Sequence, residues 1–133
     1  MSTIFSKIVS GEIPAHKVAE TSDYLAFLDI NPLRAGHVLV IPKTEVDYIF
    51  DLDDEQYTGL MIFAKVVATA LKKAMHCKKI GITVIGLEVP HAHIHLIPIN
   101  GIADMNFSQP KLNPTEKELS EVALKILEAL KES

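Results

Sequence analysis

The chain has 133 residues, of which 48% are hydrophobic and 23% are charged. This length and composition are typical of one compact domain of mixed structure, so the sequence predicts a single domain over residues 1–133. The chain has thirteen Lys and Arg and seventeen Asp and Glu, so its formal net charge is −4. This charge gives no indication of a basic surface for a nucleic-acid duplex or an anionic membrane. We therefore expect neither a nucleic-acid polymer nor a membrane as a partner.

Cysteine content and the length of apolar runs exclude further classes of protein. Cys77 is the only cysteine, which excludes an intramolecular disulfide. The first residues lack the long apolar core of a signal peptide. The longest apolar runs, such as 38–41, are far shorter than the about 20 residues that a bilayer requires. The sequence therefore predicts a cytoplasmic protein.

The first elements in chain order follow from hydrophobic period and from Gly and Pro breaks. A short helix is predicted over Thr3–Ser10, followed by two strands, Lys17–Glu20 and Tyr24–Asp29. The polar trio at 21–23 suits a hairpin turn between these strands. A β-branched run at His37–Ile41 predicts a strand that is buried on both faces and central in the sheet.

The second half of the sequence contains the most regular helical pattern. Apolar residues recur every three or four positions from Asp53 or Asp54 to Met75, with acids at the start and lysines near the end. Two strand-like stretches follow, Ile80–Ile85 and Val89–Ile99, and we expect them to pair. After a loop over 101–113, a capping box at Thr115 begins an amphipathic C-terminal helix. The predicted class is α+β, a mainly antiparallel sheet with a long central helix and a C-terminal helix.

Histidines at alternate positions carry the strongest chemical signal. His91, His93 and His95 alternate with apolar residues, and His37 begins another apolar strand. Because the side chains of a strand alternate between its faces, the three imidazoles are expected on one face, about 6.6 Å apart. Polar residues on a solvent-facing strand are the simplest interpretation, but such a face would more naturally carry Lys, Glu or Thr. The sequence therefore predicts a site for binding or catalysis.

Clustered imidazoles suit two kinds of chemistry, and the residues alone leave both open. A transition metal takes two ligands from alternating histidines, and His37 offers a third. Catalysis by a histidine nucleophile uses one neutral imidazole for attack and an acceptor that holds its other nitrogen. Neighbouring imidazoles then bind an anion or deliver a proton.

The segment Pro90–Ile97 resembles the His-x-His-x-His-x-x motif, with x apolar, of the histidine-triad (HIT) family. Three further segments resemble landmarks of that family in the same order, namely 4–15, 26–32 and 36–43. The resemblance covers about Ile4 to Pro98 and looks most like the Hint branch of small nucleotide hydrolases and transferases. It implies a homodimeric HIT-like α+β domain, with the tail and helix at 101–133 outside the matching region.

The resemblance also implies an enzyme that needs no cofactor and no metal for attack. Such an enzyme binds a purine nucleoside phosphate of the AMP type. It cleaves at the α-phosphorus of a phosphoramidate or mixed anhydride through a covalent nucleotidyl-histidine. His93 is then the nucleophile, and the backbone carbonyl of His91 holds its other ring N–H. His95 contacts phosphate oxygens and the leaving group, and His91 with His37 forms a hydrogen-bonded support.

Nucleotide-binding residues follow from the same resemblance. Asp29 corresponds to the acid that accepts hydrogen bonds from both ribose hydroxyls, although the residues alone equally favour a turn-capping acid. Gly86 and Glu88 correspond to the turn that approaches the phosphates. Positions that enclose the base are apolar and, without the resemblance, are interpreted as core. They are Ile4, Phe5, Ile13, Phe27, Leu28 and Ile30.

The sequence departs from the Hint pattern at two places. The stretch Gly81–Glu88 lacks the family asparagine and has Leu87 where Gln is expected, which removes side-chain donors to phosphate. Ser6 and Glu45 occupy positions at which some bacterial members bind a structural zinc, so no such zinc is expected.

Two alternatives of other classes stay open. One is a nucleotide-binding regulatory module with little turnover, because a sequence reveals a pocket and not a rate. The other is a His-ligated metal protein. It is disfavoured because no cysteine and no aspartate stands at ligand spacing beside the triad, although His37 keeps it open.

The helix and the tail raise two further expectations. The long apolar-striped helix, together with the strand after it, is a candidate for a two-fold dimer interface. The tail residues Met105 and Phe107, with the stretch 106–112, are candidates to reach the active-site mouth of either subunit.

Overall fold

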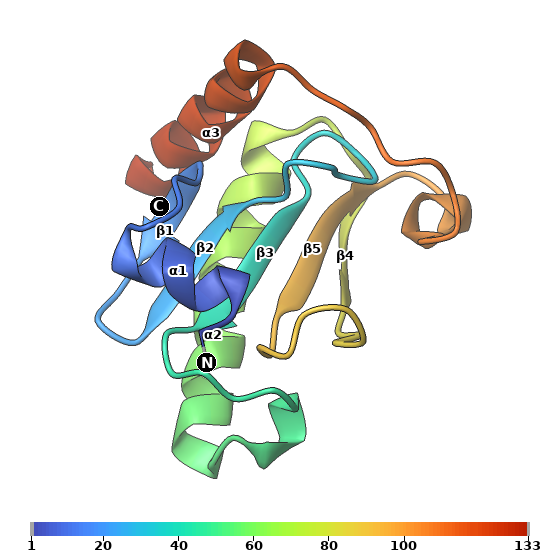
Figure 1. Ribbon diagram of the computed structural model, residues 1–133. Coiled ribbons are helices and arrows are strands. Elements are labelled where there is room, and N and C mark those ends of the chain that lie inside the picture. Colours follow the sequence, from blue (N-terminus) through green and yellow to red (C-terminus); the bar gives the residue numbers. More distant parts are fainter. Residues whose placement is uncertain (1, 133) are drawn as a thin grey trace.

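The computed structural model describes residues 2–132 as a five-stranded antiparallel sheet packed with helices, the predicted α+β class (Figure 1). The α-helices are α1 (Ile4–Ser10), α2 (Asp54–Ala74) and α3 (Glu116–Lys131). The strands are β1 (Lys17–Glu20), β2 (Tyr24–Leu28), β3 (Val38–Pro42), β4 (Lys79–Thr83) and β5 (Ile94–Ile99). Two short 3₁₀ turns are η1 (Ile49–Asp51) and η2 (Ile102–Met105).

The strand order is β1-β2-β3-β5-β4, so β3 is the central strand, as predicted. All five residues of β3 are buried, which explains its unbroken apolar sequence. The predicted hairpin between β1 and β2 and the predicted pairing of β4 with β5 are both confirmed. Since β4 has a partner on one side only, it is an edge of the sheet among the described strands.

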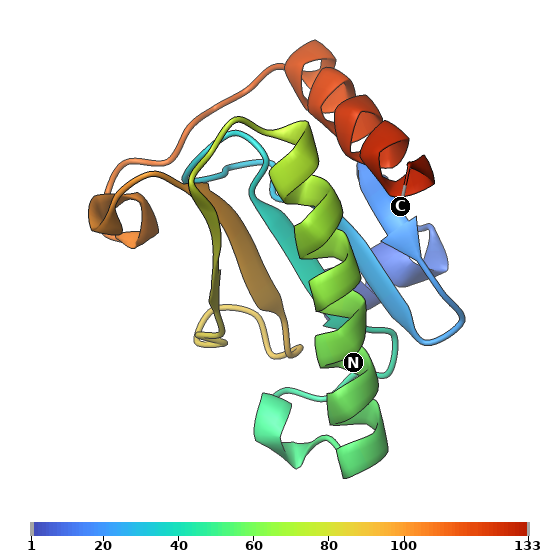
Figure 2. The same cartoon turned by 180° about the vertical axis from the view of Figure 1, so that it is seen from behind.

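Helices cover both faces of the sheet. In Figure 1, α1 lies in front of the sheet, and Figure 2 shows α2 crossing the opposite face with α3 beside it. The side chains of β2 point alternately to the two faces of the sheet. Ala26 and Leu28 pack into the core under α2, whereas Leu25 and Phe27 pack with α1. The sheet is therefore sandwiched between two apolar clusters.

The helix ends follow the capping residues in the sequence. Asp53 caps α2 by accepting a hydrogen bond from the backbone N–H of Gln56 at 2.8 Å. The predicted capping box of α3 is present, with Thr115 and Glu118 each accepting from the other's backbone N–H. Thr3 caps α1, and its hydroxyl also contacts the ring of His91.

One strand prediction is wrong at its start. The stretch Val89–Ile99 was expected to be extended and paired throughout, but β5 begins at Ile94. The backbone N–H of His91 bonds to the carbonyl of Val89 at 2.8 Å, and that of Ala92 bonds to the carbonyl of Val46 at 2.7 Å. The first bond is a turn within the segment, and the second attaches the segment to the loop after β3 instead of to β4.

The loop predicted over 101–113 contains the short turn η2. From η2 the chain crosses past the strand ends and returns to α3, which packs against α2 and β1 (Figures 1 and 2). Within residues 2–132 no helix is long and apolar enough to span a bilayer. The compartment stays a prediction of the sequence.

Candidate active site

The three triad histidines lie on one side of their segment even though the strand starts late. Ala92, Ile94 and Leu96 all pack into the core under α2. The histidines between them therefore face the side of the sheet that carries α1. The rings of His93 and His95 are 4.9 Å apart, and the ring of Phe5 from α1 packs edge-on against His93 at 5.0 Å.

A backbone carbonyl fixes the tautomer of His93. Nδ1 of His93 lies 2.7 Å from the carbonyl oxygen of His91, which is the hydrogen bond that the resemblance implies. Because a carbonyl oxygen only accepts, Nδ1 must carry the hydrogen. In the neutral ring, Nε2 is then left with an unshared lone pair.

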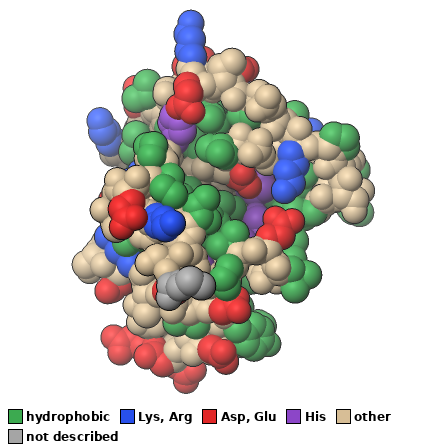
Figure 3. Space-filling model, viewed as in Figure 1, with side chains coloured by type: hydrophobic (Ala, Val, Ile, Leu, Met, Phe, Trp, Pro, Cys, Tyr) green, Lys and Arg blue, Asp and Glu red, His purple; other side chains and the backbone are tan. Residues whose placement is uncertain are grey.

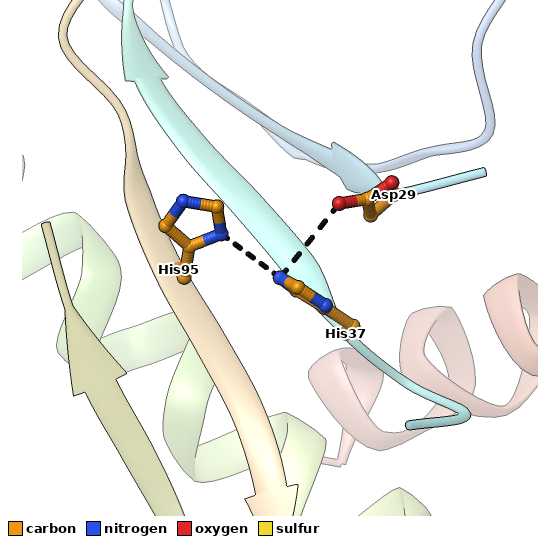
Figure 4. A group of neighbouring side chains, drawn as sticks. All are labelled: Asp29, His37 and His95. Carbon is orange, nitrogen blue, oxygen red and sulfur yellow. Dashed lines mark hydrogen bonds and ion pairs between the residues drawn. The ribbon is translucent and has the colours of Figure 1, made fainter. Parts of the chain in front are cut away.

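A backbone amide fixes the opposite tautomer in the neighbouring pair. The N–H of Leu33 donates to Nδ1 of His37 at 3.1 Å, so the hydrogen of the neutral His37 ring is on Nε2. That N–H donates to Nδ1 of His95 at 2.9 Å, as Figure 4 shows. His95 must therefore carry its own hydrogen on Nε2. His93 thus offers a lone pair, and His95 beside it offers an N–H.

His91 is held by other partners. Its Nε2 donates to the carbonyl of Pro42 at 2.8 Å, and its Nδ1 lies 3.0 Å from the hydroxyl of Thr3, which donates to it. His91 and His37 are both hydrogen-bonded as supports, but through separate partners and not to one another. His37 meets His95 because β3 and β5 are neighbours, with Leu39 opposite His95, whereas His91 precedes β5 and turns toward α1.

Ser6 and Glu45 lie together beside His91. The Ser6 hydroxyl donates to Oε1 of Glu45 at 2.6 Å, and the backbone N–H of Thr3 donates to the same oxygen at 2.9 Å. These hydrogen bonds, that of Ser6 foremost, lower the pKa of the Glu45 carboxyl. A hydrogen-bonded cluster therefore connects α1, the loop after β3 and the residue that holds His93.

Burial keeps the supporting imidazoles neutral. It lowers the pKa of His37 to about 3 and that of His95 to about 4, with charge repulsion from neighbouring groups adding to both shifts. Burial also lowers the pKa of His91. At neutral pH the pair His37–His95 therefore has no net charge, which is consistent with its hydrogen-bond pattern.

A pocket of about 440 Å³ opens at these rings. In the space-filling view, histidine side chains are visible at the bottom of a hollow, with acidic and basic side chains around it (Figure 3). Eight of the residues predicted for the site line this pocket. They are Ile4, Phe5, Asp29, Ile30, Gly86, Glu88, His93 and His95.

The other predicted residues lie elsewhere. His37 and His91 are behind the rings that they support. Ile13 and Phe27 belong to the apolar cluster beneath Phe5. Leu28 lies on the opposite face, in the core under α2. Consecutive strand residues point to opposite faces, so Phe27 and Leu28 cannot both enclose one ligand.

Asp29 lies closer to the triad than the sequence suggested. Its Oδ2 is 3.8 Å from Nε2 of His37, because Asp29 and His37 flank the turn between β2 and β3 and their backbones are hydrogen-bonded at 3.0 Å (Figure 4). No aspartate stands at ligand spacing beside the triad in the sequence, but the fold brings Asp29 next to His37 and His95 from a distant segment. Burial raises the pKa of the Asp29 carboxyl, an effect that the N–H of Asn31 opposes.

Asp29, His37 and His95 are the described residues whose atoms could share a metal ion, since one ligand atom of each lies within 4.8 Å of the others. Two of these atoms, Nε2 of His37 and Nδ1 of His95, already form a hydrogen bond. A metal would have to displace that hydrogen. The hydrogen bond alone accounts for the closeness of the two rings.

The tail reaches the site, as expected from Phe107 and the stretch 106–112. The ring of Phe107 packs edge-on against His95 at 4.9 Å and against His37 at 6.2 Å. Lys111 lines the pocket. No local sequence pattern distinguishes Lys111 from the other lysines of the chain.

Met105, which was also a candidate to reach the site, lies over β4, where its sulfur occupies the space that a Cβ on Gly81 would need.

Fold and pocket together define an α+β protein with a histidine-lined pocket. The sequence profile of the HIT domain matches residues 10–101. An uncharacterized HIT-like protein of Borreliella burgdorferi is 36% identical over 131 residues, which cover 92% of this chain and 94% of the relative. The chain belongs to the HIT family.

Two further relatives are informative. An adenosine 5′-monophosphoramidase of Schizosaccharomyces pombe is 40% identical over 99 residues, which are 74% of each chain. The crystal structure of a Hit-like protein from Bartonella henselae has a TM-score of 0.85 at 32% identity and covers 96% of both chains. The matched profile ends at residue 101, so the tail that carries Phe107 and Lys111 lies outside it.

The buried histidines predict a loss of stability in mild acid. Their pKa values in the folded chain are about 3 for His37 and about 4 for His95, whereas an unfolded chain has histidines near 6.5. The unfolded state therefore binds more protons as pH falls below 6.5. We expect the free energy of unfolding to fall by roughly 2–4 kcal/mol between pH 7.5 and 5.0, with the raised pKa of Asp29 offsetting a small part.

Urea unfolding at the two pH values measures this difference. The matched control is His76→Gln, because His76 is exposed and the variant should retain the full pH dependence. Equal unfolding free energies at pH 7.5 and 5.0 would show that the histidines are not held neutral.

Proposed function

We propose that the protein is a nucleotide hydrolase or transferase that cleaves an adenosine 5′-phosphoramidate, or a related mixed anhydride, at the α-phosphorus. The observation that carries this proposal is the pair of opposed tautomers. His93 has its lone pair on Nε2, His95 has its N–H on Nε2, and the rings are 4.9 Å apart. A nucleophile beside a hydrogen-bond donor is the arrangement that substitution at phosphorus requires.

In the first step, Nε2 of His93 attacks phosphorus and the bond to the leaving group breaks. The His93 ring becomes positively charged, and the carbonyl of His91, which accepts its Nδ1–H, stabilises that charge. A bound phosphate raises the pKa of the neighbouring His95, so the His37–His95 pair takes up a proton with the substrate. His95 then delivers this proton from Nε2 to the leaving amine or oxygen.

In the second step, water attacks the phosphorus and the P–N bond to His93 breaks. One proton of the water goes to the His37–His95 pair, and His93 returns to its neutral Nδ1–H tautomer. AMP leaves with the hydroxyl group of the water on its phosphorus, and no group is oxidised or reduced. An alcohol or amine in place of water makes the reaction a transfer.

The remaining lining residues suit the nucleoside. The Asp29 carboxylate has free lone pairs for the ribose hydroxyls while one oxygen accepts from Asn31 at 2.9 Å. Ile4, Phe5 and Ile30 offer apolar surface for a purine base. The activity named for the Schizosaccharomyces pombe relative supports this choice of substrate.

We also propose a homodimer formed through β4 and α2. β4 is a sheet edge, and Ile82 on it is 51% exposed. Ile82 pairs with Leu96, whose side chain faces α2, so Ile82 points to the same side as the exposed Ile62 and Val66 of α2. An open edge beside exposed apolar side chains is typical of a surface that a second copy covers.

Replacing the nucleophile tests the proposed reaction. Wild type incubated briefly with an adenosine phosphoramidate should release AMP or gain the mass of a nucleotidyl group. His93→Ala should lose both, with turnover reduced by more than about 10³-fold, because the other histidine that lines the pocket, His95, carries its hydrogen on Nε2 and has no lone pair there for attack. Intact-protein mass spectrometry and AMP release measure the two quantities.

His76→Ala is the matched control, since His76 is exposed and absent from the pocket lining. Turnover that survives in His93→Ala would contradict the assigned nucleophile. A wild type that binds AMP without an adduct or product would favour a nucleotide-binding module.

The dimer is tested with Ile82→Lys, which places a charge on the sheet edge. Sedimentation should give twice the chain mass for wild type and the single-chain mass for the variant, because the lysine would be buried without a partner. The exposed Leu124→Lys on α3 is the control and should leave the mass unchanged. A monomeric wild type would disprove the dimer.

A further inference from the structure

Charge in the pocket is unevenly distributed. Two carboxylates, of Asp29 and Glu88, line it together with the rings of His93 and His95. Among the lining residues, all of which belong to the described part of the chain, Lys111 is the single Lys or Arg. A phosphate group that enters this pocket therefore meets one permanent positive charge.

His95 and its partner His37 supply no positive charge to the pocket before the substrate binds. The pKa of His95 is about 4 and that of His37 is about 3, so both rings are neutral at pH 7. The turn at 86–88 presents Leu87 and Glu88, and neither side chain donates a hydrogen bond to an anion. Phosphoryl transfer depends on stabilising negative charge on the phosphate oxygens. A cation in this pocket would supply that stabilisation.

Two contacts fix the tail around Lys111. On one side, Asp104 pairs with Arg34 at 2.9 Å. On the other, the backbone N–H of Leu112 donates to the carbonyl of Pro32 at 2.8 Å. Arg34 and Pro32 both belong to the turn between β2 and β3, which also carries Asp29 and His37 at its ends. Lys111 is thus attached to the same turn as two residues of the site.

The ring of Phe107 strengthens this attachment because it packs against both His95 and His37. The positive charge of Lys111 acts on the site, since it adds to the lowering of the pKa values of His37 and His95 and opposes the raised pKa of Asp29. Within residues 2–132 Lys111 has no acidic partner at ion-pair distance. Its ammonium group is therefore available to a ligand.

We propose that Lys111 binds the 5′-phosphate group of the nucleotide, so that the tail beyond the HIT profile supplies the phosphate-recognition residue of the pocket. This proposal rests on the proposed function, because it assumes a nucleotide in the pocket. Lys111 contacts the phosphate group, whereas Asp29 and the apolar lining residues contact the nucleoside. The tail then sets the preference for a phosphorylated ligand over the bare nucleoside.

Calorimetric titration with AMP and with adenosine tests this division of roles without requiring turnover. Lys111→Ala should weaken AMP binding by about 10-fold, since one charge-assisted hydrogen bond is lost. Adenosine binding should change less than 2-fold. Lys111→Arg should retain most of the affinity for AMP, and Lys111→Glu should lose more than Lys111→Ala. The matched control is Lys117→Ala, because Lys117 is exposed on α3 and does not line the pocket.

The possible results separate the two proposals. AMP binding that is unchanged in Lys111→Ala would overturn the role of Lys111 and leave the proposed function intact. Equal losses for AMP and adenosine would also overturn it, since they would indicate that the lysine only holds the tail in place. A wild type that binds neither ligand would contradict the proposed function and the inference together.

Discussion

The chemistry of this site depends on two backbone groups that can each act in only one way. The carbonyl of His91 can only accept a hydrogen bond, and the amide of Leu33 can only donate one. The first keeps the hydrogen of His93 on Nδ1. The second, through His37, keeps that of His95 on Nε2. Adjacent rings of the same residue type therefore take complementary roles.

The fold keeps these two groups in place. The central strand β3 begins next to His37, and its neighbour β5 carries His95, so both rings are buried in a sheet that is covered on its two faces. Burial also removes charge from the pair, as the low pKa values of His37 and His95 indicate. The same burial leaves the His37–His95 pair without charge, and the proposed recognition of phosphate therefore relies on Lys111, outside the sheet.

Local patterns in the sequence predicted the sheet, the helices and the alternation that separates the triad from Ala92, Ile94 and Leu96. They failed where a backbone hydrogen bond crosses between distant segments, as at the start of β5, where Ala92 bonds to Val46. The contact of Asp29 with His37 arises from a turn, and the place of Lys111 arises from a tail folded back on that turn. Neither follows from hydrophobic period, because the partners are set by tertiary structure.

The tautomers can be observed directly by long-range ¹H–¹⁵N NMR of the histidine rings at pH 8. We expect His93 to carry its hydrogen on Nδ1 and His37 and His95 to carry theirs on Nε2. Single substitutions of each histidine by Gln assign the signals. An Nε2–H tautomer for His93, or an Nδ1–H tautomer for His95, would contradict the central claim, because the lone pair and the donor would then be in the wrong places for attack at phosphorus.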